Sequence, residues 1–317
     1  MTTPGVDPVA LSPIDMGVPW KGISFGLATA IIWGTWPVLS RFGVQQSLLA
    51  VDVAMLRFLV SGLVLLPLVL RRGHGGLGWG RAMVLAIGAG APYALVTILG
   101  FSYAPAGHGG LIIPSVMLTC STLGGWLLLK DRPNGKRLTG LVIVLSGVVT
   151  IGSAGTMAGD GFSMLWLGHV LFASGGMLWA VYTIFSRKWG ADPLHTTALV
   201  SVLSLALYGP VYLMMQGTAL VQAPIEELLL HGIAQGLVAA VLALICYTKA
   251  VALLGAGRAA LFAALVPGFS ALFAYPILGE VPTTRHLLGL ALVTFGMVLA
   301  LGIRFGRSRT KLPPMPT

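Results

Sequence analysis

Long apolar segments separated by short polar ones run along almost the whole chain. The strongest polar breaks lie at 71–81, 130–137 and 216–227. A helix rises about 1.5 Å per residue, so roughly 20 apolar residues cross a hydrocarbon layer about 30 Å thick. Ten segments meet this length, near 22–42, 51–70, 81–102, 107–129, 138–155, 164–186, 194–215, 231–252, 257–279 and 286–303. Strand-type alternation is absent. The pattern therefore predicts an all-α polytopic membrane protein with ten transmembrane helices.

The composition excludes most other classes of protein. Of the 317 residues, 56% are hydrophobic and 9% are charged, against about 25% charged in soluble domains. The mean hydropathy is +0.91. So few charges cannot cover a water-facing surface, which excludes a soluble enzyme, a disordered chain and a nucleic-acid-binding protein. The two cysteines, Cys120 and Cys246, lie in apolar segments, so we expect no disulfide framework, metal site or cofactor.

The basic residues predict the orientation. When the ten helices are threaded across a membrane, sixteen of the 19 Lys and Arg residues fall on one side and only Arg41 and Arg285 on the other, while Arg57 lies within a span. Loops rich in Lys and Arg remain in the cytoplasm. We therefore expect a multi-pass protein of the cell (inner) membrane with both termini cytoplasmic, the C-terminal tail resting on anionic lipid.

The chain contains an internal repeat. The segment WGTWPVLSRFG at 33–43 matches WAVYTIFSRKW at 179–189, AGHGGL at 106–111 matches AGRAAL at 256–261, and LTGLVIVLSGVV at 138–149 matches LLGLALVTFGMV at 287–298. Each repeat has five spans, and an odd number inverts the second copy, as in many secondary transporters. The predicted units are a cytoplasmic tail, two inverted five-helix repeats and a basic tail, at 1–21, 22–155, 164–303 and 304–317.

These residues resemble the drug/metabolite transporter superfamily, specifically its ten-helix EamA-type exporters. The resemblance is carried by WGTWPVLSRF at 33–42, MLRFLVSGLVLLPLVLRR at 55–72, the span 106–152, and the related segment 265–302. It implies an exporter of small metabolites, such as amino acids, that works by alternating access at a central cavity. The pattern differs between the halves, because Asp131 stands where the second half has Glu280.

Arg57 is the strongest candidate for a substrate-binding residue. It lies about six residues inside the second span, with no acidic residue in the middle third of any span, and an arginine at depth costs about 2.5–3.5 kcal/mol on insertion scales. One interpretation is that Arg57 extends to the outer interface or bonds to helix carbonyls. The other is that Arg57 offers positive charge to an anionic group of the substrate, such as a carboxylate.

Aromatic and hydroxyl side chains complete the predicted cavity. Tryptophan prefers membrane interfaces, so mid-span tryptophans call for a hydrogen-bond partner or a cavity; ordinary helix packing remains the alternative for each residue. The candidates are Trp33, Trp36, Tyr93, Ser115, Thr119, Trp179, Tyr182 and Tyr247. A half-apolar cavity of this kind suits amphipathic metabolites better than sugars.

Only a few residues are candidates for proton coupling or for hinges. With carboxylates absent from mid-span, proton coupling would fall to His108 or His169; otherwise both are interfacial histidines, and transport is uncoupled or an exchange. Prolines inside spans bend helices, and we expect hinges at Pro37, Pro114 and Pro267, with Pro92 also within a span.

Two other classes of function remain as alternatives. A polytopic membrane enzyme would need a constellation such as HExxH or paired intramembrane aspartates, which the sequence lacks. A lipid-flippase-type subunit without solute transport is usually shorter. The expected partners are a small-molecule solute and the lipid bilayer, with no nucleic acid and with the oligomeric state left open.

Overall fold

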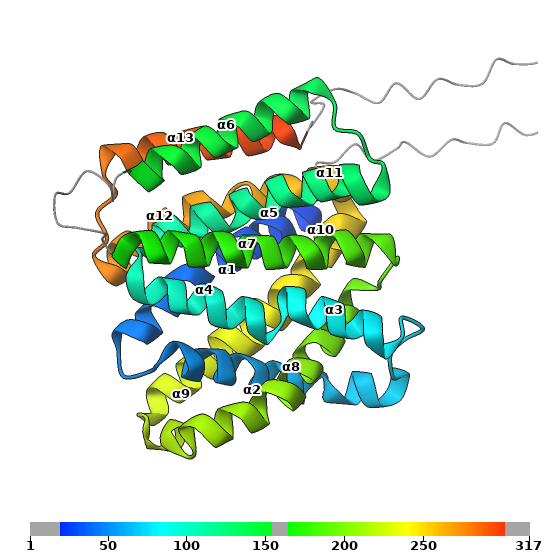
Figure 1. Cartoon of the computed structure of the whole chain (residues 1–317), viewed down its shortest axis with the longest axis vertical. Helices are drawn as coiled ribbons and strands as arrows, with labels where there is room; N and C mark the ends of the chain where they lie inside the picture. The colour runs from blue at the N-terminus through cyan, green and yellow to red at the C-terminus, as the bar shows by residue number, and fades with distance from the viewer. Residues whose placement is uncertain (1–19, 154–163, 302–317) are drawn as a thin grey trace, which may run out of the picture.

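The computed structural model describes residues 20–153 and 164–301; most of both predicted tails and the 154–163 segment lie outside this range. Within it, regular secondary structure is helical throughout (Figure 1). The helices are α1 (Trp20–Gln45), α2 (Ala50–Arg72), α3 (Trp79–Ala89), α4 (Ala91–Tyr103), α5 (Ala106–Leu129), α6 (Gly135–Gly152), α7 (Met164–Lys188), α8 (Pro193–Gln216), α9 (Ile225–His231), the π-helix η3 (Gly232–Leu242), α10 (Ala243–Leu254), α11 (Ala256–Ala263), α12 (Val266–Leu278) and α13 (Thr284–Ala300), with a short 3₁₀ turn at Ala219–Gln222.

The predicted all-α polytopic fold is confirmed. In the described part of the chain, nine helical segments are long and apolar enough to cross a membrane, and the shorter apolar helix α13 supplies the tenth. We call the end at which α1 begins the inner end, following the predicted orientation, and the opposite end the outer end. The helices run across Figure 1, with the inner end on the right.

Three of the predicted spans are not continuous α-helices. The span 81–102 breaks at Gly90, and Pro92 lies in the first turn of α4. The span 257–279 breaks between α11 and α12, and Pro267 lies in the first turn of α12. Proline lacks a backbone N–H and is tolerated at such a position. The eighth span begins at Ile225 and includes the wide π-helix η3.

Side chains in the polar segments between the spans cap the helices that follow. The Asn134 side chain accepts a hydrogen bond from the backbone N–H of Arg137, and the Asp192 side chain accepts one from His195. Thr283 caps α13 in the same way. Each cap satisfies a backbone N–H that has no partner within its own helix.

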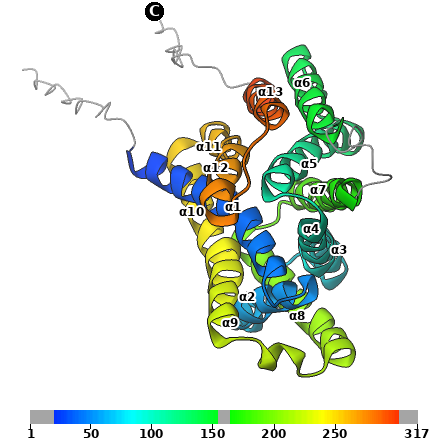
Figure 2. The same cartoon turned by 90° about the vertical axis from the view of Figure 1, so that its left-hand side faces the viewer.

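The two repeats exchange their first helices. Helix α1 packs against α10 and α12 of the second repeat, and α7 packs against α4 and α5 of the first. Figure 2 shows the two groups on opposite sides of the molecule. We call α1 with α10, α11 and α12 the first wall, and α7 with α3, α4 and α5 the second wall. Helices α2 and α8 pack together at one edge, and α6 packs against α13 at the other.

Small residues let α6 and α13 approach closely. A Cβ added to Gly140 would lie 2.5 Å from the backbone nitrogen of Ala300, and one added to Gly147 would lie 2.8 Å from the carbonyl oxygen of Gly289. The lack of a side chain at these positions is therefore required for backbone contact, as is common between membrane helices.

Candidate functional site

A cavity of about 910 Å³ lies between the two walls. At the inner end its lining includes the exposed residues Asp192 and Pro193, and toward the outer end it stops near Pro37 and Gly109. The cavity therefore opens at the inner end and is closed at the outer end. Its size falls within the range of sites for small molecules.

Arg57 projects into this cavity from α2. Its side chain is 8% exposed, and its guanidinium carbon lies 5.7 Å from the ring centre of Trp36 and 5.9 Å from that of Phe58. The buried Nε has no hydrogen-bond partner, and within the described residues no carboxylate pairs with Arg57. Asp192, which lines the inner end of the cavity, uses its carboxylate to cap α8 instead, so Arg57 has no ion-pair partner among the described residues.

The nearest acidic residue in sequence, Asp52, has other partners. Its carboxylate accepts hydrogen bonds from the backbone N–H of Leu49 at 2.8 Å and from the Tyr212 hydroxyl at 2.5 Å. Tyr208 donates to the carbonyl of Val51 beside it. Asp52 therefore anchors the start of α2 to α8 and leaves the charge of Arg57 uncompensated.

Aromatic rings from both walls surround the cavity. The ring centres of Trp36 and Tyr93 are 6.0 Å apart, those of Tyr93 and Trp179 4.7 Å, and those of Trp179 and Tyr182 5.5 Å. On the first wall Trp33 packs against Tyr247 at 5.3 Å. The structure therefore brings seven of the predicted site residues to the lining: Trp33, Trp36, Arg57, Tyr93, Trp179, Tyr182 and Tyr247.

The predicted hydroxyls of Ser115 and Thr119 do not reach the cavity. Ser115 donates to the carbonyl of Leu111 at 2.7 Å, and Thr119 donates to that of Ser115 at 2.9 Å, both within α5. Serine and threonine inside helices commonly bond to the carbonyl four residues earlier, which the sequence argument overlooked. Ser201 of α8 lines the cavity instead; a single serine in an apolar segment gives no sequence signal of this role.

His108 and His169 meet near the outer end, beyond the cavity lining. His108 Nδ1 lies 2.9 Å from His169 Nε2. His286, which sequence reasoning missed, lies with its ring centre 5.3 Å from that of His108. Within the described residues no group of His, Cys, Asp and Glu side chains is arranged to hold a metal ion.

The three predicted hinge prolines occupy different positions. Pro37 and Pro114 lie inside α1 and α5 and line the cavity. Pro267 instead begins a helix after a break, so it does not interrupt a continuous helix as the sequence suggested. Whether any of them acts as a hinge stays a prediction.

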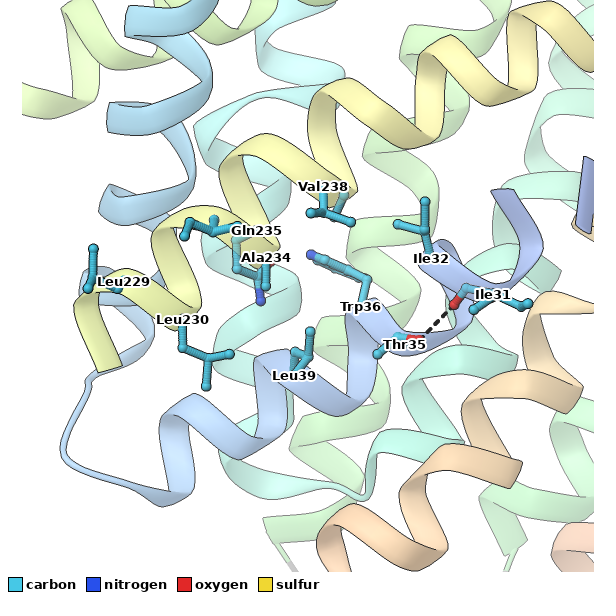
Figure 3. A pocket seen from close by; sticks show the side chains of 12 residues that line it. Ile31, Ile32, Thr35, Trp36, Leu39, Leu229, Leu230, Ala234, Gln235 and Val238 are labelled. Carbon is cyan, nitrogen blue, oxygen red and sulfur yellow. Dashed lines mark hydrogen bonds between the residues drawn. The ribbon is translucent and has the colours of Figure 1, made fainter. Parts of the chain in front are cut away.

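A second, shallower hollow of about 320 Å³ lies between α1 and the segment α9–η3 (Figure 3). It is bordered by the exposed apolar side chains of Leu229, Leu230 and Ile233. Trp36 and Ala239 line both this hollow and the central cavity, so they form the partition between the cavity and the apolar surface of the protein.

Comparison with known proteins decides the family. The model of the EamA-like transporter family matches residues 20–153 and 166–302. The chain belongs to the EamA-like transporter family. The predicted resemblance is therefore confirmed, and each matched segment contains five spans.

Two relatives of this EamA-like protein are named as transporters. The chain is 26% identical over 280 residues to an "Uncharacterized transporter" of Archaeoglobus fulgidus, covering 86% of this chain and 94% of that protein. It is 23% identical over 290 residues to the "Uncharacterized inner membrane transporter YedA" of Escherichia coli K12, covering 89% and 90%. A solved structure titled "Crystal structure of protein" shares the fold, with a TM-score of 0.63 and 21% identity over 88% of this chain and 98% of the other.

Proposed function

We propose that this EamA-like protein is a secondary transporter that exports small amphipathic metabolites with an anionic group, such as amino acids, by alternating access at the central cavity. The observation that carries the proposal is the buried, unpaired guanidinium of Arg57 in a cavity open at one end. A buried charge without a partner is unfavourable, and a carboxylate from the solute would remove that cost.

The surroundings of Arg57 favour a particular shape of solute. A carboxylate can accept two parallel hydrogen bonds from a guanidinium. The rings of Tyr93 and Trp179, which pack edge to face, then offer an apolar surface to the rest of the molecule. Few polar groups line the cavity, so a sugar would leave many of its hydroxyls unpaired.

The inner opening of the cavity fits the loading state of an exporter, while the direction itself follows from the resemblance to EamA-type exporters. In this conformation a solute can enter from the end predicted to face the cytoplasm, which is the loading state of an exporter. The exchanged first helices place each repeat in both walls, and an inverted repeat of this kind allows the walls to rock and open the outer end instead.

Transport into proteoliposomes tests the proposal. Protein reconstituted at a known density is loaded with an unlabelled amino acid, and the uptake of the labelled amino acid is compared with uptake by protein-free liposomes. We expect at least one amino acid to exchange faster than in the protein-free liposomes, and Arg57→Gln to reduce that difference strongly when the amino acid is supplied below its half-saturating concentration. A folded protein that accelerates none of the amino acids would overturn the proposal.

Proton coupling is a separate part of the proposal and rests on His108 and His169. This part is supported by their close contact at the outer end, where His108 Nδ1 lies 2.9 Å from His169 Nε2. An imposed pH gradient should drive accumulation, and the His108→Gln, His169→Gln double variant should retain exchange but lose the response to the gradient. Accumulation that persists in the double variant would exclude this route; exchange indifferent to pH in the unaltered protein would favour uncoupled transport.

A further inference from the structure

The Arg41 and Glu280 side chains connect the two walls at the outer end. Both belong to the first wall, and Arg41 Nε lies 2.6 Å from Glu280 Oε1. Each side chain also contacts the second wall at the turn between α4 and α5. Arg41 donates to the carbonyl oxygens of Phe101 and Ala104 at 2.6 and 2.9 Å.

The carboxylate completes this contact from the other side of the turn. Glu280 accepts hydrogen bonds from the backbone N–H groups of Ala106 and Gly107, at 3.1 and 3.4 Å. These groups begin α5, where the helix dipole favours a negative charge. The pair therefore docks as a unit, with its cation on the carbonyls that end α4 and its anion on the N–H groups that begin α5.

The inverted repeat carries a second pair at the inner end. The 33–43 and 179–189 match aligns Arg41 with Arg187, and the match between the last spans of the two repeats aligns Glu280 with Asp131. Arg187 Nη1 indeed lies 2.7 Å from Asp131 Oδ2. The Arg187 hydrogen bond holds the pKa of the Asp131 carboxyl below its ordinary value, so this pair is charged at neutral pH.

The outer pair is mostly buried, whereas the inner pair is exposed. The side chains of Arg41 and Glu280 are 18% and 17% exposed, whereas those of Arg187 and Asp131 are 62% and 34% exposed. The inner pair belongs to the second wall, so its docking turn would be the α10–α11 turn of the first wall. The added Cβ of Gly257, which aligns with Gly107, meets no atom within 4 Å, so that turn is unoccupied.

We propose that the two pairs are alternating latches, each docking into the turn of the opposite wall when its own end closes. In the present conformation the outer latch is docked and the inner one is undocked, with Asp131 contacting Arg187 and, at 3.8 Å, Arg137 of its own repeat. In the outward-open conformation, Asp131 accepts from the N–H groups of Ala256 and Gly257 while Glu280 leaves α5. Arg258, aligned with His108, then adds a positive charge beside Asp131. The proposal rests on the alternating access of the proposed function.

Distances between spin labels test this in the full-length protein in lipid nanodiscs. Both native cysteines are replaced by alanine, and labels are placed on exposed side chains of opposite walls. One label pair, at Met164 and Val281, reports the outer end, and another, at Leu127 and Leu253, reports the inner end.

Removing the charge of the outer latch should open the outer end. We expect Glu280→Gln to raise the ratio of outward-open to inward-open molecules by about tenfold, the effect of losing hydrogen bonds to a charged group. Adding the repeat-related change Asp131→Asn should reverse most of that rise, because the inner latch is then weakened as well. An unchanged ratio in Glu280→Gln, or no reversal in the double variant, would overturn the latches.

A charge swap separates docking from simple ion pairing. The Arg41→Glu, Glu280→Arg variant keeps the pair but places a carboxylate against the carbonyls of α4 and a guanidinium against the N–H groups of α5. We expect it to be as open at the outer end as Glu280→Gln. Restoration of the closed outer end would show that only the ion pair matters and would contradict docking.

A substitution at the buried Arg41–Glu280 pair could impair folding, so a second test uses the exposed inner pair. In the cysteine-free protein, Val38→Cys places a thiol at a fully buried position in the outer half of α1, where labelling requires outer opening. Asp131→Asn should slow its labelling about tenfold; an equal or faster rate overturns the proposal. If the spin labels show one conformation in every variant, the proposed alternating access is contradicted. If they show two conformations whose ratio does not change with these substitutions, only the latch proposal is contradicted.

Discussion

The guanidinium carbon of Arg57 lies 5.7 Å from the ring centre of Trp36, in a cavity where no carboxylate balances its charge. The Trp36 ring gives partial compensation through its electron-rich face, worth about 0.5–2 kcal/mol. A bound carboxylate would compensate the charge far better. The pair therefore leaves a buried positive charge beside an aromatic surface, and the proposed preference for an anionic solute rests on this arrangement.

Loss of the positive charge should weaken solute binding. We expect Arg57→Gln to raise the half-saturating concentration of a transported amino acid about tenfold to a hundredfold, since hydrogen bonds to charged groups contribute about 1.5–3 kcal/mol. The half-saturating concentration of Arg57→Lys should lie between those of the unaltered protein and Arg57→Gln, because lysine keeps the charge but loses the paired donors. Exchange in proteoliposomes measures the effect, and equal half-saturation in all three proteins would contradict it.

The same arginine should destabilise the empty protein. Replacing a buried unpaired charge with an apolar side chain of similar length removes its desolvation cost, so Arg57→Met should raise the midpoint of thermal unfolding without solute. Arg41→Met is the matched control, because Arg41 is paired with Glu280, and it should lower the midpoint. A lowered midpoint in both variants would argue that Arg57 is a structural residue.

The aromatic lining should contribute to affinity, and the α5 hydroxyls should not. Trp179→Ala removes the ring that packs on Tyr93, and we expect about a tenfold loss of affinity for an aromatic amino acid. Ser115→Ala should change affinity less than about twofold, since its hydroxyl bonds to Leu111 in its own helix. Solute-dependent thermal stabilisation reports both, and a reversed order of effects would remove Trp179 from the site.

The contact between α6 and α13 should tolerate no side chain at its centre. Gly140→Val places atoms against the Ala300 backbone, and overpacking of this kind costs about 1–3 kcal/mol. Gly152→Val is the control, because a Cβ there meets no atom within 4 Å. Unfolding by denaturant in detergent compares them, and equal stability of both variants would mean that the helices can separate freely.

Much of the fold follows from the sequence because membrane spans have simple requirements. Apolar length and internal repetition predict ten spans in two inverted halves, and the span at 81–102 is confirmed as Trp79–Tyr103. Apolar length alone does not predict the break of this helix at Gly90, just before Pro92. The exchange of α1 and α7 between the walls carries no local signal. It depends on packing between helices that lie far apart in the sequence.

The candidate site was predictable to the extent that its residues violate the rules of a lipid-facing helix. Arg57 and Trp36 do so, and the structure places both in the cavity. The hydroxyls of Ser115 and Thr119 donate to carbonyl oxygens of their own helix. Their residue type alone therefore wrongly suggested that they line the cavity. The two latches were hidden because an arginine at a helix end is ordinary; only the geometry at the α4–α5 turn distinguishes Arg41 from Arg187.

In the proposed function, Arg57 binds the negative charge of the solute inside the cavity. The most direct measurement is thermal stabilisation of the purified protein by matched solutes, each amino acid against its carboxamide, in the unaltered protein and in Arg57→Gln. We expect some amino acids to raise the unfolding midpoint, their carboxamides to leave it unchanged, and Arg57→Gln to lose the response. Equal stabilisation by carboxamides, or an undiminished response in Arg57→Gln, would contradict it.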